Sequence, residues 1–342
     1  MEKRKAVYLI KQGKASEAFE VREDAIPNLK PHEVGIKVEA FGLNYADVMA
    51  RNGLYREAPP LPAVLGYEVV GEIVDVGSDV DKTNIGKRVV AFTRFGGYAD
   101  YAVTEVIGFA EIGELDAGQA LSIATQYVTA YYMAYDVTNL FEGDRVLVHA
   151  GAGGVGTALI QLCKRKGCEV FATAGSDDKL DYMRDQGADH VINYRSEDYE
   201  ESVNQLLQNK RLDVTFNPVA GSTFKKDFRL LGSGGRLLLF GGSERSGKKW
   251  GIFSTLNFLR KMGLIIPIGT MMRSKSIIGV NMLKIGDNKP KTLQRCMQNV
   301  TELVKNKEVV PHIGGEFSVS EIAEAHAFLE SRESIGKIVI KW

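Results

Sequence analysis

The chain has 342 residues, of which 44% are hydrophobic and 25% charged, and its 43 Lys and Arg balance its 43 Asp and Glu. This composition is typical of a globular protein and excludes a disordered chain, a collagen-like fibre and a disulfide scaffold. The length favours two domains, and the zero net charge gives no electrostatic reason to expect binding to nucleic acid.

Cysteine use and hydropathy bear on the compartment. The three cysteines, Cys163, Cys168 and Cys296, are too few to hold together a chain of this length. We interpret them as thiols in a reducing cytoplasm. No run reaches the roughly 20 apolar residues that span a bilayer. We therefore expect a cytoplasmic protein.

The first third of the chain predicts short β-strands. Residues 6–10, 33–39 and 69–76 are rich in β-branched side chains, and Gly, Pro, Asn and Asp separate them. This pattern indicates a compact, mostly antiparallel lobe.

The pattern changes near residue 115 to alternating helices and strands. Apolar residues at helical spacing predict a helix over 117–133. The alternation that follows predicts a parallel sheet with helices on both faces. Strands are expected at 145–150, 169–174, 191–193, 212–217, 235–240 and 276–280, with helices at 155–165 and 179–186.

The C-terminal residues return to a mixed pattern. Helices are predicted over 291–306 and 320–330, the second with Ser320 as its N-cap, and a strand over 336–340. Because so short a tail is a poor candidate for independent folding, we expect it to pack on the N-terminal lobe.

The strongest chemical motif is the run 149–156 (HAGAGGVG), which contains G-x-G-x-x-G at Gly151, Gly153 and Gly156. The run follows an apolar strand and opens a helix, which is the context that dinucleotide binding requires. The glycines allow a tight turn, close approach of a pyrophosphate and close helix packing. The helix N-terminus then presents unpaired N–H groups to the phosphates.

The residues after the second strand favour NADP over NAD. An NAD site usually places a carboxylate at the tip of this strand, but the sequence there reads Gly175-Ser176, and the acidic Asp177 follows late. Lys179 could meet a 2′-phosphate as a point charge, with Ser176 donating a hydrogen bond. Alternatively Ser176 is a helix N-cap and the acidic residues complement the helix dipole; both interpretations can hold together.

Several motifs, in order, give the chain a family resemblance. They are residues 42–47 (GLNYAD), 51–55 (RNGLY), 62–68 (PAVLGYE), 150–156 (AGAGGVG) and Gly336-Lys337. With these motifs the chain resembles, essentially from end to end, the quinone oxidoreductase branch of the medium-chain dehydrogenases/reductases. Within that branch, residues 47–51 (DVMAR) and 250–269 make it most similar to the vesicle amine transport protein homologues.

The resemblance implies an α/β fold in which a GroES-like, mostly β catalytic domain (1–124 and 284–342) surrounds a doubly wound Rossmann domain (125–283). It also implies NADPH as cofactor and a homodimer. At position 217 the chain departs from the family, because Asn217 stands where Asp is usual. The implied cofactor contacts are Asn44, Thr129, Gly151, Ala152, Gly153, Gly154, Val155, Gly156, Gly175, Ser176, Lys179, Tyr194, Asn217, Val219, Phe240, Gly241, Gly279, Val280 and Lys337.

The same resemblance bears on zinc. Zinc alcohol dehydrogenases of the superfamily hold their metal with a Gly-His-Glu motif and cysteines, whereas this chain reads Gly66-Tyr67-Glu68 and has no Cys among residues 1–161. Zinc needs about four ligands, and Glu68 alone does not supply them. We expect neither a catalytic nor a structural zinc.

Without zinc, an electron-poor acceptor is expected, either a quinone or an enone. Such acceptors need little acid–base help for hydride transfer, because the cofactor carries the chemistry. The candidate proton donors are Asp47, Tyr55 and Tyr67, with solvent as a rival, and Asn44 is a candidate hydrogen-bond partner for a carbonyl or a ribose hydroxyl. Alternatively Asp47 caps a helix start, and the two tyrosines pack as an amphipathic wall.

The apolar segment 250–272, with basic residues at 248–249 and 260–261, leaves several interpretations open. It could be a lid or subunit contact, it could pack on its own domain, or it could lie on a membrane surface. A membrane-peripheral or scaffolding protein on a reductase fold is therefore the alternative to a quinone or enone reductase. An alcohol dehydrogenase is a weaker alternative, because the zinc ligands are missing.

Overall fold

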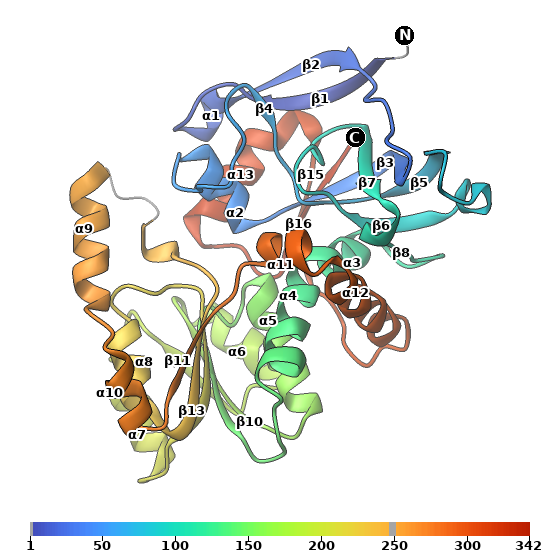
Figure 1. The fold of residues 1–342 in the computed structure, drawn as a ribbon. Helices are drawn as coiled ribbons and strands as arrows, with labels where there is room; N and C mark the ends of the chain where they lie inside the picture. Colours follow the sequence, from blue (N-terminus) through green and yellow to red (C-terminus); the bar gives the residue numbers. More distant parts are fainter. Residues whose placement is uncertain (1–2, 246–250) are drawn as a thin grey trace. The chain divides into compact units, whose positions relative to one another are not determined.

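Two structural units are formed by three stretches of the chain in the computed structural model, which describes residues 3–245 and 251–342 (Figure 1). Unit 1 comprises Met1–Val128 and Leu283–Trp342, and unit 2 comprises Thr129–Met282. The chain thus enters unit 1, builds unit 2 and returns to unit 1.

Unit 1 is built on two β-sheets, whose neighbouring strands are antiparallel except for the parallel pair β15–β16. The prediction of a mostly antiparallel lobe is confirmed. The smaller sheet has the order β2(Phe19–Ala25), β1(Lys3–Leu9), β4(Ala63–Val64). The larger has the order β15(Ile313–Ser318), β16(Lys337–Lys341), β3(Glu33–Leu43), β5(Glu68–Val76), β6(Arg88–Phe92), β8(Phe109–Glu111), and β7(Tyr101–Glu105) also pairs with β3.

The helices of unit 1 cover a core of side chains from these strands. Ile36 and Phe41 of β3, Ile73 of β5 and Ile338 of β16 are fully or almost fully buried in one cluster. The helical elements are α1(Ala15–Ala18), α2(Tyr45–Arg51), η1(Lys82–Asn84), η2(Val106–Gly108), α3(Ala117–Ser122), α11(Met282–Asn288), which starts at the unit boundary, α12(Pro290–Lys305), η6(Val319–Glu321) and α13(Ile322–Ser331).

Two predicted helices differ in detail from the structure. Ser320 is not the cap of the last helical segment, because Ser318 fills that role in a capping box with Glu321, whose carboxylate accepts the Ser318 N–H at 2.8 Å. The helix predicted over 117–133 continues to residue 137, but it includes two π-helical stretches. It runs through α3, η3(Ile123–Tyr127), α4(Val128–Tyr131) and η4(Tyr132–Val137).

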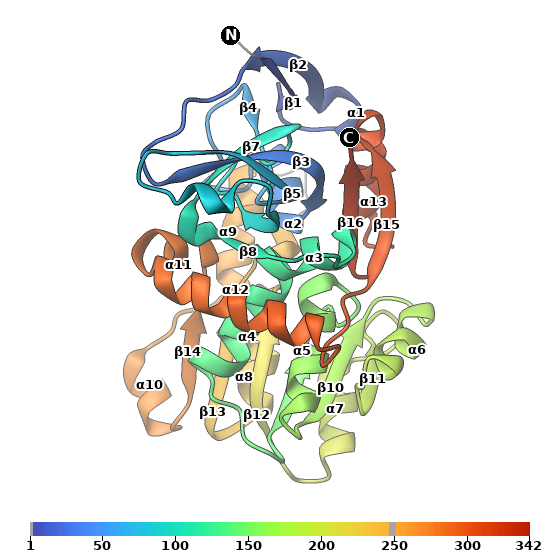
Figure 2. The ribbon, with the colours of Figure 1, turned by 90° about the vertical axis from the view of Figure 1, so that its right-hand side faces the viewer.

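Unit 2 is a six-stranded parallel sheet, as predicted, with helices in the connections (Figure 2). The strand order reverses after β11, so right-handed crossovers place the helices before and after this reversal on opposite faces of the sheet. The order is β11(His190–Asn193), β10(Glu169–Ala174), β9(Arg145–Val148), β12(Leu212–Asn217), β13(Leu231–Leu239), β14(Ser276–Gly279). The helices are α5(Gly154–Arg165), α6(Asp178–Asp185), α7(Tyr199–Leu207), α8(Phe224–Leu230), η5(Ser243–Arg245), α9(Gly251–Met262) and α10(Pro267–Met272).

A buried ion pair joins the C-terminal strand to the N-terminal sheet. β3 lies between β5 and β16, and Glu68 of β5 and Lys337 of β16 meet across Gly42 of β3. Both side chains are completely buried. A Cβ at Gly42 would lie 2.4 Å from Glu68 Oε1 and 2.4 Å from Lys337 Cε, so the pair needs glycine at this position.

The pair generates a stability prediction. Lys337→Met should lower the free energy of unfolding by about 3–5 kcal/mol, because it leaves the Glu68 carboxylate buried without its cation. The double variant Glu68→Gln/Lys337→Met should recover most of this loss, since it removes both charges. Equilibrium unfolding in urea, followed by circular dichroism, measures both.

Lys341→Met on the same strand is the matched control, because Lys341 pairs with Glu316 at the surface and exposed pairs contribute little. Equal losses in Lys337→Met and Lys341→Met would contradict the assigned role of the buried pair.

Candidate functional site

The predicted cofactor contacts of unit 2 gather at the carboxyl edge of the parallel sheet. The glycine loop joins β9 to α5, and β9 and β12 are neighbours at the point where the strand order reverses. In open α/β sheets such a point is where ligands bind. Residues 175–179 follow β10, Tyr194 follows β11, residues 217–219 end or follow β12, residues 240–241 follow β13, and residues 279–280 end or follow β14.

The three glycines of the loop differ in why the structure has no side chain at each position. A Cβ at Gly156 would lie 2.2 Å from the Ala150 carbonyl oxygen, and one at Gly151 would lie 2.5 Å from Met183 Sδ. A Cβ at Gly153 would meet only the Ala150 oxygen, at 3.3 Å. Two glycines are therefore needed for packing of the loop itself, whereas the third leaves its surface open to a ligand.

The N-terminus of α5 provides the hydrogen-bond donors of this loop. Thr157 N–H donates to the Gly153 carbonyl at 2.8 Å, so the N–H groups of residues 154–156 precede the first intrahelical bond. Unpaired first-turn N–H groups and the helix dipole suit a pyrophosphate. The loop residues Gly151, Ala152, Gly153, Gly154, Val155 and Gly156 thus fit a dinucleotide.

The residues predicted for a 2′-phosphate surround Gly175. A Cβ on Gly175 would lie 2.6 Å from the Tyr194 hydroxyl and 3.2 Å from Arg195 Nε. Ser176 and Lys179 are half-buried beside it. Arg195 is a further cation that sequence reasoning missed; its place directly after Tyr194 was the available signal. A cation and a hydroxyl near a bare glycine suit an anionic group, and Lys179 lies in the first turn of the helix that follows.

The alternative role of Ser176 as an N-cap is wrong. Helix α6 begins at Asp178, and Asp177 occupies the N-cap position. The Asp177 side chain accepts a hydrogen bond from Asn193 Nδ2 at 2.7 Å instead. Ser176 therefore lies outside the helix.

The residues predicted for the nicotinamide side are connected through their backbones. Phe240 N–H donates to the Asn217 carbonyl at 3.2 Å, and Val280 N–H donates to the Leu239 carbonyl at 2.9 Å. A Cβ at Gly241 would lie 2.6 Å from the Pro218 oxygen, so this glycine allows the close approach. The structure thus brings Asn217, Val219, Phe240, Gly241, Gly279 and Val280 to neighbouring strand ends, while Thr129 lies on α4, almost fully buried.

The catalytic candidates of unit 1 lie around the start of α2. Asn44 precedes the helix, and its backbone N–H donates to the Asp47 carboxylate at 2.9 Å in a capping box. The alternative role of Asp47 as a helix-start residue is therefore confirmed. Asn44 Nδ2 donates to Glu68 Oε1 at 2.8 Å, and Lys337 Nζ donates to Asn44 Oδ1 at 3.2 Å. The amide of Asn44 is thus held at both ends.

Protons are held tightly in this cluster. Burial, reinforced by the charge of Glu68, raises the pKa of Asp47 to about 7. Burial raises the pKa of Tyr55 to about 12, and burial with the Asp47 charge raises the pKa of Tyr67 further. The Tyr55 and Tyr67 rings meet edge-on at 6.3 Å. Asp47 therefore has a pKa matched to proton transfer near neutral pH, whereas the two tyrosines keep their protons and can donate hydrogen bonds.

Lys337, predicted as a cofactor contact, makes its hydrogen bonds within unit 1. Its ammonium group donates to the Leu43 carbonyl at 3.3 Å, to Asn44 Oδ1 and to Glu68 Oε1. An ammonium has three hydrogens, and these three acceptors account for them. Lys337 therefore supports Asn44 in the structure.

The donor set does not fit a zinc ion. Among residues 3–245 and 251–342, no group of three or more His, Cys, Asp or Glu side chains could hold a metal. Glu68 Oε1 accepts hydrogen bonds from Lys337 and Asn44, so the carboxylate already has a cation beside it.

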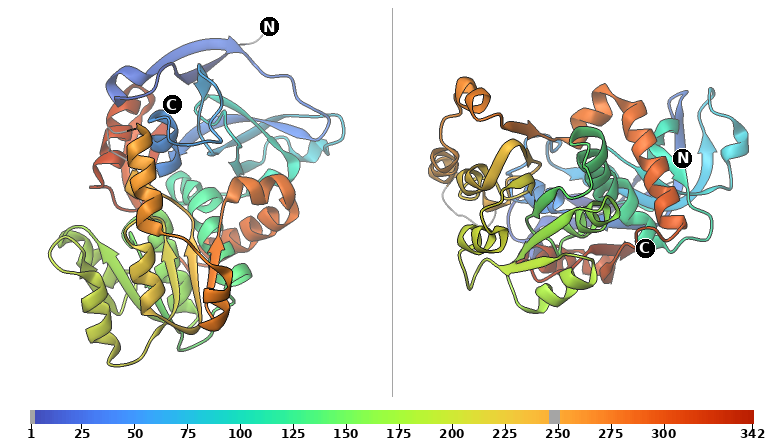
Figure 3. Two further views of the ribbon diagram at one scale, coloured as in Figure 1. Left: turned by 60° about the vertical axis from the view of Figure 1, so that its left-hand side comes forward. Right: turned by 90° about the horizontal axis from the view of Figure 1, so that it is seen from below.

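The apolar segment 250–272 includes Trp250, which lies outside the described residues. Helix α9 packs against α8 (Figure 3). Phe258 Cδ2 lies 3.0 Å from a Cβ built on Gly221. Leu264 remains 89% exposed and Met272 77%. Within the part of the chain that the structure describes, none of the helices is long and apolar enough to cross a bilayer.

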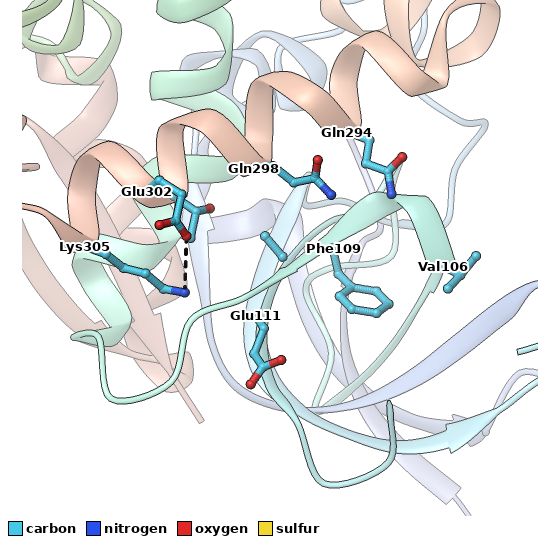
Figure 4. Close-up of a pocket in the computed structure, with 9 residues that line it drawn as sticks. Val106, Phe109, Glu111, Gln294, Gln298, Glu302 and Lys305 are labelled. Atoms are coloured by element: carbon cyan, nitrogen blue, oxygen red, sulfur yellow. Dashed lines mark ion pairs between the residues drawn. The ribbon is translucent and has the colours of Figure 1, made fainter. Parts of the chain in front are cut away.

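A separate groove of about 400 Å³ lies in unit 1 between α12 and the strand β8 (Figure 4). Phe109 lines it opposite Gln294 and Gln298, and Glu302 and Lys305 form an ion pair of 3.8 Å at one end. None of the predicted site residues lines it.

Comparisons with known proteins cover both units. Residues 30–130 match the family model "Alcohol dehydrogenase GroES-like domain", and residues 154–306 match "Zinc-binding dehydrogenase". The chain is 30% identical to the quinone oxidoreductase of Homo sapiens over 95% of its length and 94% of that protein. It is 31% identical to the synaptic vesicle membrane protein VAT-1 homolog of Danio rerio over 92% of its length, and it spans 65% of that relative.

The fold agrees with a solved relative over its whole length. The Escherichia coli quinone oxidoreductase complexed with NADPH superposes with a TM-score of 0.86 at 25% identity, covering 99% of this chain and 100% of that one.

The loop geometry generates a prediction for Gly153. Gly153→Val should preserve the fold, because φ −76° and ψ 164° are allowed for any L-residue and only the Ala150 oxygen is near. It should abolish dinucleotide binding, because the side chain fills the space over the first-turn N–H groups. Far-UV circular dichroism and calorimetric titration measure the two effects.

Gly156→Ala is the control, because its Cβ collides with the loop itself and should destabilise the fold. Retained binding in a folded Gly153→Val variant would overturn the assignment of this loop.

Proposed function

Because the chain belongs to the medium-chain dehydrogenase/reductase superfamily of oxidoreductases, we propose that it is an NADPH-dependent, zinc-independent reductase of quinones or enones. The observation that carries the proposal is the bonding of Glu68. Its carboxylate is engaged by Lys337 and Asn44, so unit 1 offers hydrogen-bonding and acidic groups in place of a metal. The similarity to a quinone oxidoreductase complexed with NADPH supports it.

NADPH is the cofactor that the basic side chains support. Lys179 and Arg195 both follow Ser176 in the sequence, and Arg195 approaches Gly175 in space. A 2′-phosphate there would have cations and hydroxyl donors, whereas the ribose carboxylate of an NAD site is missing from the strand tip. When bound, the cofactor supplies the hydride.

The residues of unit 1 supply orientation and the proton in this proposal. Asn44 Nδ2 has a second hydrogen besides the one donated to Glu68, and this hydrogen suits the carbonyl oxygen of the acceptor. Asp47, whose pKa of about 7 leaves it partly protonated at neutral pH, shares a capping box with Asn44, and the two tyrosines keep their protons at this pH. Burial of this cluster keeps water away from the charged groups.

The protein is proposed to act in the cytoplasm as a homodimer. Its three cysteines are free and buried, which suits a reducing compartment. Strand β14 lies at the edge of the six-stranded sheet, and α9 and α10 expose apolar side chains, so a subunit contact there would cover both.

A second candidate function is favoured by the same exposed apolar side chains. Leu264, Ile266 and Ile268 are more than half exposed, with Arg260 and Lys261 before them. Apolar side chains beside cations suit the surface of an anionic membrane. A membrane-peripheral protein with weak or no turnover is this second candidate.

Turnover separates the two candidates. NADPH oxidation, followed at 340 nm, should accelerate with at least one member of a panel of quinones and enones and should be unaffected by a zinc chelator. Co-sedimentation with anionic liposomes is measured in parallel. Binding of NADPH without reduction of any quinone, enone or aldehyde, together with co-sedimentation, would favour the second candidate.

Cofactor choice is tested at Lys179 and Arg195. Each single change to Ala should raise the KM for NADPH by roughly ten- to a hundredfold, as loss of a charge-assisted hydrogen bond predicts. The KM for NADH should stay almost constant, because NADH lacks the 2′-phosphate.

Arg184→Ala on the same helix as Lys179 is the matched control, since Arg184 pairs with Asp181 at the surface. Equal effects on the two cofactors would show that the 2′-phosphate pocket is misassigned.

A further inference from the structure

A buried polar network lies beneath the loops at the carboxyl edge of unit 2. Its central member is Asp227 of α8, which is completely buried, as is Asn217 at the end of β12. His149, directly before the glycine loop, is 3% exposed. None of these charges and amides is required for packing of an apolar core, and burial of such groups is costly unless all of them are hydrogen-bonded.

The Asp227 carboxylate is the common hydrogen-bond acceptor of the network. Its Oδ1 atom lies 2.9 Å from His149 Nε2 and accepts the Tyr199 hydroxyl at 2.9 Å, and its Oδ2 atom accepts Asn217 Nδ2. Thr173 of β10 contacts the other ring nitrogen of His149 at 3.0 Å. Burial and the Asp227 charge raise the pKa of Tyr199, so this hydroxyl remains a donor.

Asn217 transmits this arrangement to the loop that follows β12. Its Oδ1 atom accepts the N–H groups of Val219 at 2.7 Å and Ala220 at 2.8 Å. Its Nδ2 atom donates to Thr223 Oγ1 at 2.8 Å as well as to Asp227. Ala220 has a φ of +56°, a conformation that these two hydrogen bonds help to hold.

We infer that Asn217 and Asp227 are positioning residues. The buried Asp227 carboxylate fixes the orientation of the Asn217 amide, and this amide holds the loop 217–220 on the nicotinamide side of the proposed cofactor site. The inference rests on the proposed function. The pair needs one carboxylate and one amide, and the geometry allows them to be exchanged.

The donors and acceptors explain why each single change fails. Asn217→Asp places two carboxylate oxygens against each other, where the amide hydrogen now lies. Asp227→Asn keeps acceptors for His149 and Tyr199, but its new NH₂ group faces the NH₂ group of Asn217. If Asn217 then turns over, it loses the N–H groups of Val219 and Ala220.

The exchange Asn217→Asp/Asp227→Asn restores the pattern. Asp at 217 accepts both loop N–H groups with one oxygen and the amide of Asn at 227 with the other. Asn at 227 keeps an oxygen for His149 and Tyr199. The hydrogen bond between position 217 and Thr223 is not restored, because the Thr223 hydroxyl donates to the Ala220 carbonyl at 2.9 Å and cannot also donate to position 217. The rescue should therefore be large but incomplete.

The test compares binding of whole NADPH with binding of 2′,5′-ADP, which carries only the adenosine half. In calorimetric titration of the full chain, Asp227→Asn and Asn217→Asp should each weaken NADPH by roughly tenfold, as an unsatisfied buried polar group predicts. Affinity for 2′,5′-ADP should change less than twofold. The exchanged double variant should recover most of the NADPH affinity and of kcat with the best quinone or enone.

The control is Asp213→Asn on the same strand as Asn217, which alters the ion pair of Asp213 with Arg145. Thermal melting of all variants identifies general destabilisation. Equal weakening of both ligands, or no recovery in the double variant, would overturn the inference and leave the proposed function standing. Failure of the wild-type chain to bind either ligand would overturn both.

Discussion

The ion pair between Glu68 and Lys337 is the interaction on which unit 1 depends. It joins strands that are 269 positions apart in the chain, and it forms only because Gly42 of the strand between them has no side chain. The same two groups hold both ends of the Asn44 amide, directly before helix α2. Stability of the returning C-terminal strand and orientation of the candidate catalytic amide are therefore consequences of one contact.

Unit 2 uses buried charge in a comparable way. The Asp227 carboxylate connects the ends of β9 and β12 through His149 and Asn217, beneath the loops that follow these strands. In both units a fully buried carboxylate has charged or amide partners that reach a loop. Each hydrogen bond that these buried carboxylates accept restricts the geometry, because its loss would leave a buried polar group unpaired.

Prediction from the sequence succeeded where a local signal was strong. Strands 169–174 and 212–217 were located to the residue, since each is a short apolar run between turns. Prediction failed where a side chain has more than one possible hydrogen-bond partner or where the helix geometry is irregular. Glu321 selects Ser318 over Ser320 as its capping partner, and the helical stretch after Ala117 adopts π geometry that periodicity does not reveal. Arg195 was overlooked because its approach to Gly175 depends on how β11 lies beside β10.

The sequence by itself determined the family, the alternation of strands and helices, and the glycine loop with its dinucleotide chemistry, because these depend on residues near one another in the chain. Only the tertiary structure decided which buried charges meet. Lys337 is a lone basic residue in the sequence and Asp227 a lone acid in an amphipathic helix, and each acquires its partners through strand order. Electrostatic energy depends on distance and burial, and both are set by packing between segments that are distant in sequence.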